Sequence, residues 1–474
     1  MRSGIKSKFF VGFFRFTLAF SWTLPAAAQL RVGAARVDVT PRGDALPSAF
    51  HSVLDSIFAR AILVENGKDS ILLVNADVII IQDDFYKKVV QELERATGVS
   101  QPNILLSATH DHSAPFASFQ SAGPTNPKNI AFAERLDRGI VEAAMQARAA
   151  LQPAEVGYAN GQLYLNVNRD AIDSKTRLWS QEANPAYPSD KTLAVIEFRR
   201  PGGEPIAFYM NYAMHAITTF LRQELSGDFP GAAERYVEDA YGNKVVAMWT
   251  SGAAGDQNPY YLRQNQAIGA AAIQAEMDPS KSDDSQQTES TAALFRVMFG
   301  NTERPPAKFD PMDLERSTHM MQAMGQITGE ETLIAASQIE TFDSNPLLSG
   351  ASKEVTCPGR RRLDHGREGA PGRYEDGDPI TLNIGTVRIG EIALGWADAE
   401  LYNMIGQEVK AQSPFRKTIM VSLTNGQAKS GYVPTDDAFA RSTFEVASSN
   451  LKPGCAEQSI VKGVAGIMAE EIRK

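Results

Sequence analysis

The sequence alternates between short apolar runs and longer stretches in which apolar residues recur at helical spacing. The short runs have the length and the composition of buried strands, and turn residues separate most of them. They predict strands, the first ending in a turn, at Val32 to Pro41, Phe58 to Val64, Ser70 to Ala76, Ile104 to Leu106, Leu193 to Arg199, Ile206 to Met214, Val245 to Trp249, Pro379 to Val387 and Glu391 to Trp396. Gly67 lies between the second and third runs and predicts the turn of a hairpin.

Four stretches with helical character lie between or after these runs. They predict helices from Asp83 to Thr97, Asn129 to Leu151, Gly231 to Tyr241 and Asp398 to Gln412. Gly98 and Pro153 follow the first two stretches and are typical of helix ends. Strands and helices therefore alternate over most of the chain, which favours an α/β fold with mixed β-sheets flanked by helices.

Two stretches depart from this alternation. Residues 278–310 begin polar and charge-rich and contain the breaker cluster Arg304-Pro305-Pro306, so we expect a surface excursion there. Residues 345–380 are rich in Gly, Arg and Asp, and we expect a long irregular segment that forms part of a lid or a rim. The sequence shows no internal repeat.

The first residues have the pattern of a signal peptide. Basic residues precede a largely apolar run from Phe9 to Leu24, and Ala26 to Ala28 resembles a cleavage site. Arg15 interrupts the apolar run, which disfavours a permanent membrane span. We therefore expect residues 1–28 to be removed and residues 29–474 to form a single domain that is periplasmic or secreted from a bacterium. The alternative is an anchor that is not cleaved.

Composition narrows the class of protein without changing the expected fold. Of the 474 residues, 43% are hydrophobic and 22% are charged, as in soluble globular proteins. The net charge of −9 argues against a nucleic-acid partner, which would favour a basic surface. Cys357 and Cys455 could form a disulfide after export or stay apart, because the sequence gives no distance between them. The oligomeric state is not specified by the sequence.

The candidate chemistry lies at the ends of the apolar runs, where His110, His112 and His215 stand. On a strand, residues two apart project to the same face, so His110 and His112 are expected side by side before Pro115 ends the strand. Ligand sites in α/β sheets gather outside the carboxyl ends of strands, so these three of the six histidines predict a transition-metal site. The alternatives are polar residues that mark a strand leaving the core and, for His215, a hydrogen-bonded core histidine.

Two further strand ends carry carboxylates. One run enters glycine-rich sequence around Asp256, and glycines let a backbone turn sharply beside a ligand. The last predicted helix carries Glu400 in its first turn. Each has an ordinary alternative, since Asp256 could bond its own turn and a carboxylate is stabilised at a helix N-terminus without a metal. Spacing does not single out Tyr432, by default a packed aromatic, or Arg169, by default a solvated surface residue.

These residues lie in stretches that are similar to those of a known family. The chain resembles the N-terminal catalytic domain of neutral/alkaline (non-lysosomal) ceramidases, which are zinc amidases. The matching stretches follow the family order through almost the whole mature chain: Val32 to Pro41, Thr109 to Ser113, Asn166 to Arg169, Asn211 to His215, Leu225 to Asp228, Gly255-Asp256, Ala399-Glu400 and Gly431 to Val433. At 474 residues, we expect the chain to lack the additional C-terminal domain of full-length ceramidases.

The resemblance implies roles for particular residues. Four of them would hold one zinc ion: His110, His215, Glu400 and Tyr432. Four more are predicted to act in catalysis or to contact the substrate: His112, Arg169, Asp256 and Asn258. Zinc would polarise an acyl oxygen and lower the pKa of a bound water. The implied partner is a lipid or another small molecule, with transient contact to a membrane surface.

Two positions differ from the ceramidase pattern. Asn258 takes the place of a serine, and Phe444 takes the place of a tyrosine downstream of Tyr432. An amide cannot act as a serine nucleophile, although it can donate a hydrogen bond to an oxyanion. We therefore expect an exported zinc-dependent hydrolase of an amide or N-acyl bond, with a role in sphingolipid metabolism if the substrate is ceramide-like. The alternatives are a zinc hydrolase of a non-lipid ester, lactone or amide, and a metal-binding homologue without turnover.

Overall fold

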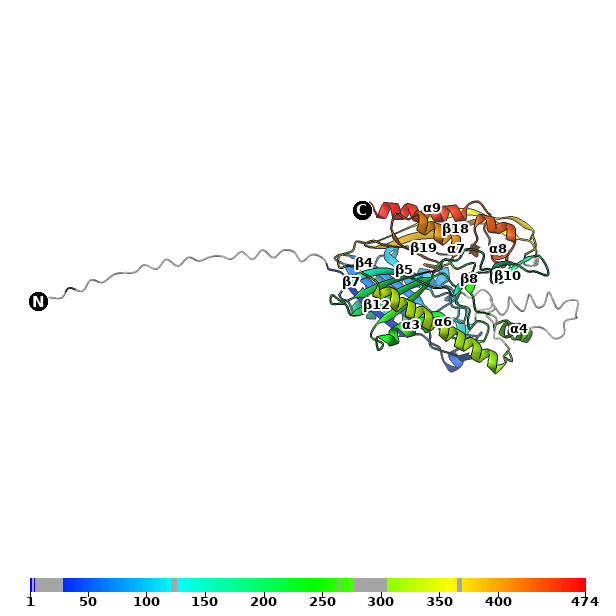
Figure 1. Cartoon of the computed structure of the whole chain (residues 1–474), viewed down its shortest axis with the longest axis horizontal. Coiled ribbons are helices and arrows are strands. Elements are labelled where there is room, and N and C mark those ends of the chain that lie inside the picture. The colour runs from blue at the N-terminus through cyan, green and yellow to red at the C-terminus, as the bar shows by residue number, and fades with distance from the viewer. Residues whose placement is uncertain (2–3, 5–28, 121–125, 263–264, 277–304, 365–368) are drawn as a thin grey trace.

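The structure is a computed structural model that describes residues 1, 4, 29–120, 126–262, 265–276, 305–364 and 369–474 (Figure 1). The predicted signal peptide and most of the predicted surface excursion lie outside these residues. The described chain forms three large mixed β-sheets, each with one parallel pair of strands, and helices pack on their faces. This arrangement confirms the predicted α/β class with mixed sheets.

The first sheet is built from N-terminal strands in the order β5-β4-β3-β1-β6. Their bounds are β1 Arg31–Asp38, β3 Phe58–Asn66, β4 Asp69–Ala76, β5 Ile104–Ala108 and β6 Gln152–Pro153. β4 and β5 run parallel, and the other neighbours run antiparallel. The helices α1 (Asp83–Thr97) and α2 (Pro127–Ala149) share a buried core with alternate strand residues such as Leu63 and Val74.

The second sheet has the order β14-β12-β11-β7-β16. Its strands are β7 Glu155–Gln162, β11 Thr192–Arg199, β12 Pro205–Tyr212, β14 Val246–Ser251 and β16 Phe342–Asp343. The helices α3 (Asp228–Ala240) and α6 (Pro311–Ser337) lie against each other beside it. Glycine permits this approach, because a Cβ at Gly325 would come within 2.3 Å of the Ala232 side chain.

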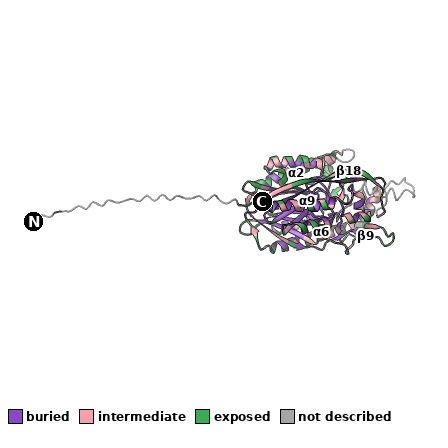
Figure 2. Cartoon of the chain, turned by 90° about the horizontal axis from the view of Figure 1, so that it is seen from above, coloured by how far each residue is buried: buried purple, intermediate pink, exposed green. Residues whose placement is uncertain are grey.

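The third sheet has the order β17-β18-β19-β21, with β17 Leu348–Arg362, β18 Tyr374–Ile389, β19 Ile392–Ala397 and β21 Lys417–Val421. The helices α7 (Asn403–Gln412) and α9 (Ala456–Glu471) pack on it (Figure 1). The three sheets meet in one central hydrophobic cluster, to which Ile62, Ile196 and Leu394 each contribute from a different sheet. Buried residues accordingly fill the interior between the helical layers (Figure 2).

Short paired strands lie outside these sheets and carry much of the candidate site. The pairs are β2 Ser52–Val53 with β13 Glu224–Leu225, β8 Asn166–Asn168 with β15 Gln257–Pro259, β9 Asp170–Ile172 with β10 Trp179–Gln181, and β20 Glu400–Leu401 with β22 Tyr432–Val433. The described residues also form the helices α4 Asn265–Glu276 and α8 Phe444–Ser448 and 3-10 turns at Gly43–Ala45, Gln101–Asn103 and Asp436–Arg441.

Turn residues correctly predicted the positions of two early elements, the hairpin around Gly67 and the helix that ends at Gly98. The predicted hairpin is formed by β3 and β4 around Gly67, whose φ is 64°. The helix predicted from Asp83 to Thr97 has these bounds, and it ends at Gly98, which adopts the left-handed conformation with φ 74°. Glycine adopts this conformation without steric cost, so the residue after the helix was a reliable signal.

The prediction of a long irregular segment at residues 345–380 was wrong. β17 and β18 form a long antiparallel ladder there, interrupted by a register shift between Cys357 and Gly359. Much of the outer half of the ladder is exposed, so its side chains do not show the apolar alternation that marks a half-buried strand. The Arg360 guanidinium instead lies 4.0 Å from the ring centroid of Tyr374 on the other strand.

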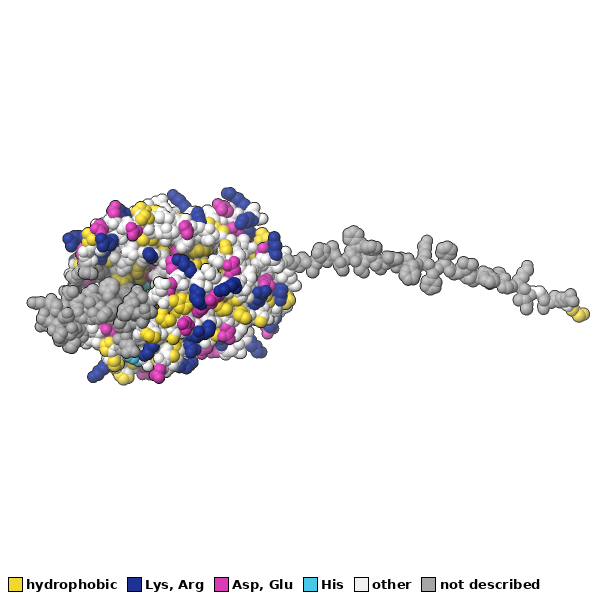
Figure 3. Space-filling model, turned by 180° about the vertical axis from the view of Figure 1, so that it is seen from behind, with side chains coloured by type: hydrophobic (Ala, Val, Ile, Leu, Met, Phe, Trp, Pro, Cys, Tyr) yellow, Lys and Arg dark blue, Asp and Glu magenta, His cyan; other side chains and the backbone are white. Residues whose placement is uncertain are grey.

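A disulfide and the distribution of surface charge complete the description of the fold. Cys357 and Cys455 form a disulfide, which joins β17 to the start of α9. Among the described residues, no helix combines the length and the apolar character needed to cross a lipid bilayer. Lys and Arg side chains are interspersed with Asp and Glu over the face of the molecule seen in Figure 3.

Candidate metal centre and active site

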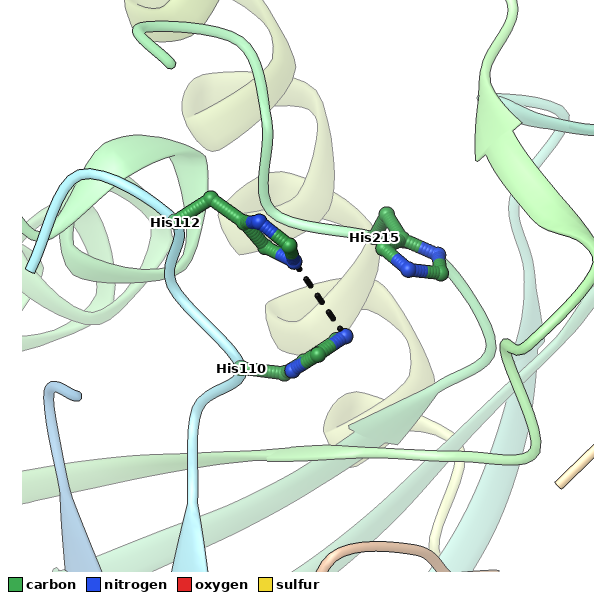
Figure 4. Close-up of side chains that lie close together, drawn as sticks. All are labelled: His110, His112 and His215. Atoms are coloured by element: carbon green, nitrogen blue, oxygen red, sulfur yellow. Dashed lines mark hydrogen bonds between the residues drawn. The ribbon is translucent and has the colours of Figure 1, made fainter. Parts of the chain in front are cut away.

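The three predicted histidines converge from two loops, one after β5 and one after β12 (Figure 4). His110 and His112 follow β5, and His215 follows β12. The two loops are joined by backbone contacts, because the His112 N–H donates to the Ala216 carbonyl at 3.0 Å. The ring centroids of His110 and His215 are 4.7 Å apart. The structure therefore brings together the three histidines that the sequence groups in one predicted site.

The reason given for the pairing of His110 with His112 was wrong. β5 ends at Ala108, so neither histidine lies on the strand. His110 has a φ of 61°, a left-handed conformation that is uncommon for a residue other than glycine. This turn, rather than the two-residue period of a strand, brings the two Nε2 atoms to 3.3 Å. Such strain in a buried loop is typical of functional sites.

Backbone carbonyls fix the orientation of two of the imidazoles. The His110 Nδ1 lies 3.0 Å from the Ile79 carbonyl oxygen, and the His215 Nδ1 lies 3.0 Å from the Gln257 carbonyl oxygen. A carbonyl only accepts, so each Nδ1 carries the proton and each Nε2 presents its lone pair. In metal sites such contacts fix the tautomer of the ligating histidine.

Glu400 completes the convergence from a different part of the chain. The prediction that it lies in the first turn of a helix was wrong, because α7 begins at Asn403 and Glu400 belongs to the short strand β20. Its Oε1 lies 2.9 Å from the His215 Nε2 and 3.2 Å from the His110 Nε2. β20 pairs with β22, and Glu400 stands directly opposite Tyr432 in the register.

This donor set fits a metal cation. The Nε2 atoms of His110 and His215 and the Glu400 carboxylate are all acceptors, yet they face one another at hydrogen-bonding distance. Tetrahedral zinc ligands with bonds of about 2.0–2.1 Å lie about 3.3 Å from one another. The separations found here, 2.9 to 3.3 Å, are close to that value. His110, His112 and His215 are also mutually close enough to hold a metal ion together. A cation at their centre would remove the repulsion between the lone pairs.

The electrostatics of the cluster favour the ligand forms of these groups. Burial, followed by the Arg169 charge, lowers the pKa of His215 to about 4. Burial and the two neighbouring imidazoles lower the pKa of His112 well below its usual value. Burial alone would raise the pKa of Glu400, but His110 and His215 together hold it well below its usual range. These shifts favour neutral imidazoles at His112 and His215 and a carboxylate at Glu400 near neutral pH, which are the forms that bind metals.

Arg169 lies beside the histidines, which overturns its default assignment as a solvated surface residue. It is 4% exposed and stands between β8 and β9. Its Nη1 donates to the Asn258 Oδ1 at 2.9 Å, and its Nη2 donates to the Tyr432 Oη at 3.3 Å. The same Nη1 lies 3.4 Å from the His215 Nε2. The guanidinium thus links three of the predicted site residues.

Tyr432 is held between Arg169 and Phe444. Its ring meets the Phe444 ring edge to face, with centroids 6.0 Å apart. Burial and the nearby Glu400 carboxylate raise the pKa of Tyr432 well above its usual value, and the Arg169 charge opposes this shift only in part. The phenol is therefore protonated in the absence of a further cation.

Asp256 lies close to the site but its carboxylate faces elsewhere. Oδ1 accepts from the Asn403 backbone N–H at 2.8 Å, and Oδ2 accepts from the Asn168 side chain at 2.7 Å. The Asp256 carbonyl accepts from the Arg169 N–H at 2.9 Å. These contacts tie the β15 loop to β8 and α7, so the geometry makes Asp256 a positioning group rather than one that reaches the histidines.

Sequence reasoning missed Glu445, a fully buried carboxylate whose Oε1 lies 2.7 Å from the Arg169 Nε. It also missed Phe220, whose ring centroid is 5.1 Å from that of His112. Neither residue lies in a motif. Glu445 directly follows Phe444, one of the two positions that differ from the ceramidase pattern. Glutamates are rarely fully buried, so nothing in the sequence indicated that this one would be.

Comparisons with known proteins agree with this geometry. The family described as neutral/alkaline non-lysosomal ceramidase, N-terminal, matches residues 49–304, which include His110, His112, Arg169, His215 and Asn258. Neutral ceramidase B of Dictyostelium discoideum is 30% identical over 191 residues, which cover 37% of this chain and 26% of that protein. The neutral ceramidase of Pseudomonas aeruginosa is 27% identical over 264 residues, which cover 50% of this chain and 38% of that protein.

Solved structures show the same fold. A structure described as ceramidase complexed with C2 superposes with a TM-score of 0.66 at 17% identity, over 94% of this chain and 76% of that chain. The neutral ceramidase of Pseudomonas aeruginosa superposes with a TM-score of 0.64 at 18% identity, over 94% and 75%. The sequence matches span about a quarter to two fifths of the curated relatives, with 26% for one and 38% for another. Because the family match covers more than half of the chain, the protein belongs to the neutral/alkaline non-lysosomal ceramidase family.

Proposed function

We propose that the protein is an exported, zinc-dependent amidohydrolase that cleaves N-acyl bonds, with ceramide-like lipids as the first candidate substrates. The observation that carries the proposal is the convergence of unprotonated Nε2 atoms and the Glu400 carboxylate at distances of 2.9 to 3.3 Å. This cluster lies within a fold shared with ceramidases, and its histidines lie in the matched segment.

The proposed zinc ligands are His110, His215, Glu400 and Tyr432. When bound there, zinc would polarise the acyl oxygen and supply hydroxide near neutral pH. The resemblance to the family supports Tyr432 as the fourth ligand. Burial raises the pKa of Tyr432 in the metal-free site, so a bound metal would have to lower that pKa before the phenolate could ligate. His112 is the competing fourth ligand, because its Nε2 lies 3.3 Å from that of His110.

Asn258 can act as a hydrogen-bond donor to the acyl oxygen. Arg169 has only donors, so the amide oxygen of Asn258 must face its Nη1, as the 2.9 Å contact requires. The amide NH2 group then points away from Arg169, and no described residue accepts a hydrogen bond from it. A donor held in this way would stabilise negative charge that develops on the acyl oxygen.

His112 is the proposed general base and acid. Its lowered pKa keeps the imidazole neutral near pH 7, so Nε2 can take a proton from the attacking water. The proton can then pass to the leaving nitrogen as the amide bond breaks. Arg169 would hold Asn258 and Tyr432 in place during both steps.

Two observations favour a lipid substrate that meets the enzyme at a membrane surface. The family is that of ceramidases. Tyr260 and Tyr261 follow Asn258 closely and are 46% and 50% exposed. Tyrosine suits the boundary between water and lipid, because it has an apolar ring and a polar end. Transient membrane contact is part of the proposal for this reason.

Asn258 and Phe444 favour a second candidate, a zinc hydrolase of non-lipid esters, lactones or amides. Both residues stand where the family pattern has a hydroxyl-bearing side chain, and both lie at the site: Asn258 contacts Arg169, and Phe444 contacts Tyr432. The loss of two hydroxyl groups also allows a third candidate, a metal-binding homologue without turnover.

Export is supported by the sequence of the first residues and by the disulfide. Cys357 and Cys455 are bonded, and such bonds persist in oxidising compartments. The intact mass of the secreted chain would test the proposal. We expect a chain that begins at residue 29, and a chain that retains Met1 would contradict cleavage.

The test of function combines metal analysis with a substrate panel. The protein is purified without added metal, its zinc content is measured, and turnover is followed with an N-acylsphingosine, a short N-acyl amine, an aryl ester and a lactone. We expect one zinc ion per chain and cleavage of the N-acyl substrates. Turnover of the ester or lactone alone would establish the second candidate, and zinc without any turnover the third. Protein that binds no zinc would contradict all three.

A further inference from the structure

The buried guanidinium of Arg169 has a single direct carboxylate contact among the described residues. Its Nη atoms meet neutral groups, Asn258 and Tyr432, while its Nε lies 2.7 Å from the Glu445 Oε1. The Nε–H bond is not aimed at that oxygen, so the contact is an ion pair rather than a well-directed hydrogen bond. Glu445 is therefore the main charge that compensates Arg169 from the side away from the site.

Glu445 is itself held in place from several directions. It lies in α8, has no exposed surface, and accepts a hydrogen bond from the Gln181 side chain at 2.6 Å. The Tyr402 Oη lies 3.5 Å from its other oxygen. These contacts come from β10 and from the segment that precedes α7, so the carboxylate occupies a fixed position relative to the loops that carry the site.

The charge balance explains why the carboxylate is needed. The Arg169 guanidinium is buried, and the carboxylate that stabilises its charge most strongly is Glu445, ahead of Glu400. A buried cation without a carboxylate would turn toward whichever anion is nearest. After Glu445, the carboxylate that acts most strongly on Arg169 is Glu400, one of the proposed zinc ligands. A guanidinium drawn to Glu400 would leave Asn258 and compete with the metal.

We propose that Glu445 is a positioning residue for Arg169, which it holds so that the Nη1 faces Asn258 and the Nη2 faces Tyr432. The inference rests on the proposed function for its kinetic consequences but not for its structural ones. Glu445 touches neither the histidines nor the substrate side of Asn258, so it acts only through Arg169.

The first test is Glu445→Gln, which keeps the shape and removes the charge. We expect kcat on the best substrate of the panel to fall about 10- to 100-fold, since small misplacement of a catalytic group has effects of this size. KM should change less than about threefold, because Glu445 acts through Arg169 and has no proposed contact with the substrate. The effect of Glu445→Gln should also be smaller in an Asn258→Ala background than alone, because both changes remove the same oriented amide.

Glu234→Gln is the matched control. Glu234 is another fully buried carboxylate that pairs with an arginine, since its Oε2 lies 2.9 Å from the Arg60 Nη1, but it contacts no site residue. Both variants should lower the melting temperature, and Glu445→Gln alone should lower kcat. If Glu445→Gln and Glu234→Gln have equal kcat, Glu445 is structural only and the proposal is wrong. The same holds if the fold-reductions in kcat caused by Glu445→Gln and Asn258→Ala multiply in the double variant, because the two changes would then act independently.

A crystal structure of Glu445→Gln tests the inference without any activity. We expect the Arg169 Nη1 to leave the Asn258 Oδ1, to a distance beyond hydrogen bonding, and an unmoved guanidinium would overturn the proposal. If the wild-type protein hydrolyses nothing on the panel, the proposed function fails while this result still decides the role of Glu445. Should Glu445→Gln not fold, Gln181→Ala removes one anchor of Glu445 from an exposed position, and the same displacement is expected to a smaller extent.

Discussion

Arg60 and Arg169 are both buried arginines, but their surroundings differ. Arg60 has no exposed surface, and its Nη1 lies 3.1 Å from the Asp77 Oδ2 and 2.9 Å from the Glu234 Oε2. Glu238 lies 3.7 Å from its Nε. Arg60 is on β3 and both glutamates are on α3, so these ion pairs connect the first sheet to the helix of the second.

Arg169 is paired with one carboxylate and otherwise contacts groups that carry no charge. Its Nη atoms reach an amide, a phenol and an imidazole, all of which border the histidine cluster. Surrounding carboxylates neutralise the field of Arg60 within the core. The field of Arg169 is instead directed toward the cluster, where negative charge develops in the proposed reaction. The comparison teaches that the partners of a buried arginine, rather than its burial, separate a structural cation from a functional one.

The largest expected effect concerns the cluster beside Arg169. His215→Ala removes a proposed zinc ligand, so we expect loss of bound zinc and a fall in turnover of at least about 10³-fold. His319→Ala is the matched control, because His319 lies on α6 with its side chain 68% exposed. Zinc content and kcat are measured for both. Retention of zinc by His215→Ala at the wild-type level would show that His215 is not a ligand.

The second prediction concerns stability and separates the two arginines. Arg60→Ala removes the cation that Asp77, Glu234 and Glu238 share, although Glu238 keeps Arg36 as a partner. Breaking a buried ion pair costs about 3–5 kcal/mol of unfolding free energy. Arg169→Ala leaves only Glu445 unpaired and should cost less. Urea denaturation in the presence of a chelator measures both values without the contribution of bound metal.

Turnover per folded molecule should show the opposite order. We expect Arg60→Ala to retain near wild-type kcat and Arg169→Ala to lose most of it. If Arg169→Ala is the less active and also the less stable variant, the distinction between a structural and a functional arginine does not hold.

The third prediction tests the amide that Arg169 orients. Asn258→Ala removes the proposed donor, and loss of one oxyanion donor lowers kcat about 10²-fold or more. Asn258→Asp has nearly the same size without the NH2 group and should be similarly impaired. Asn258→Ser should not create strong ceramidase activity, because a serine needs a base and a shaped pocket in addition to its hydroxyl. Kinetics on an N-acylsphingosine measure all three, and wild-type kcat in Asn258→Asp would exclude the donor role.

The sequence by itself determined the elements whose signals are local. The bounds of α1 follow from helical spacing and from Gly98, and the β3–β4 hairpin follows from two apolar runs around Gly67. The grouping of His110 with His215 also followed from the sequence, because both follow apolar runs that form buried strands. A shared sheet edge does not explain it, because β5 and β12 belong to different sheets. The resemblance to ceramidases added Glu400, Tyr432 and Arg169, which no local pattern distinguishes.

Only the tertiary structure decided how these residues meet. His110 and Glu400 are 290 residues apart, and Arg169 and Tyr432 are 263 residues apart, so no window of sequence contains either pair. The left-handed turn at His110, the pairing of β20 with β22 and the burial of Glu445 all depend on packing between distant segments. A local pattern records which face of an element is buried. It does not record which charge lies on the other side of the contact, and that charge gives the site its chemistry.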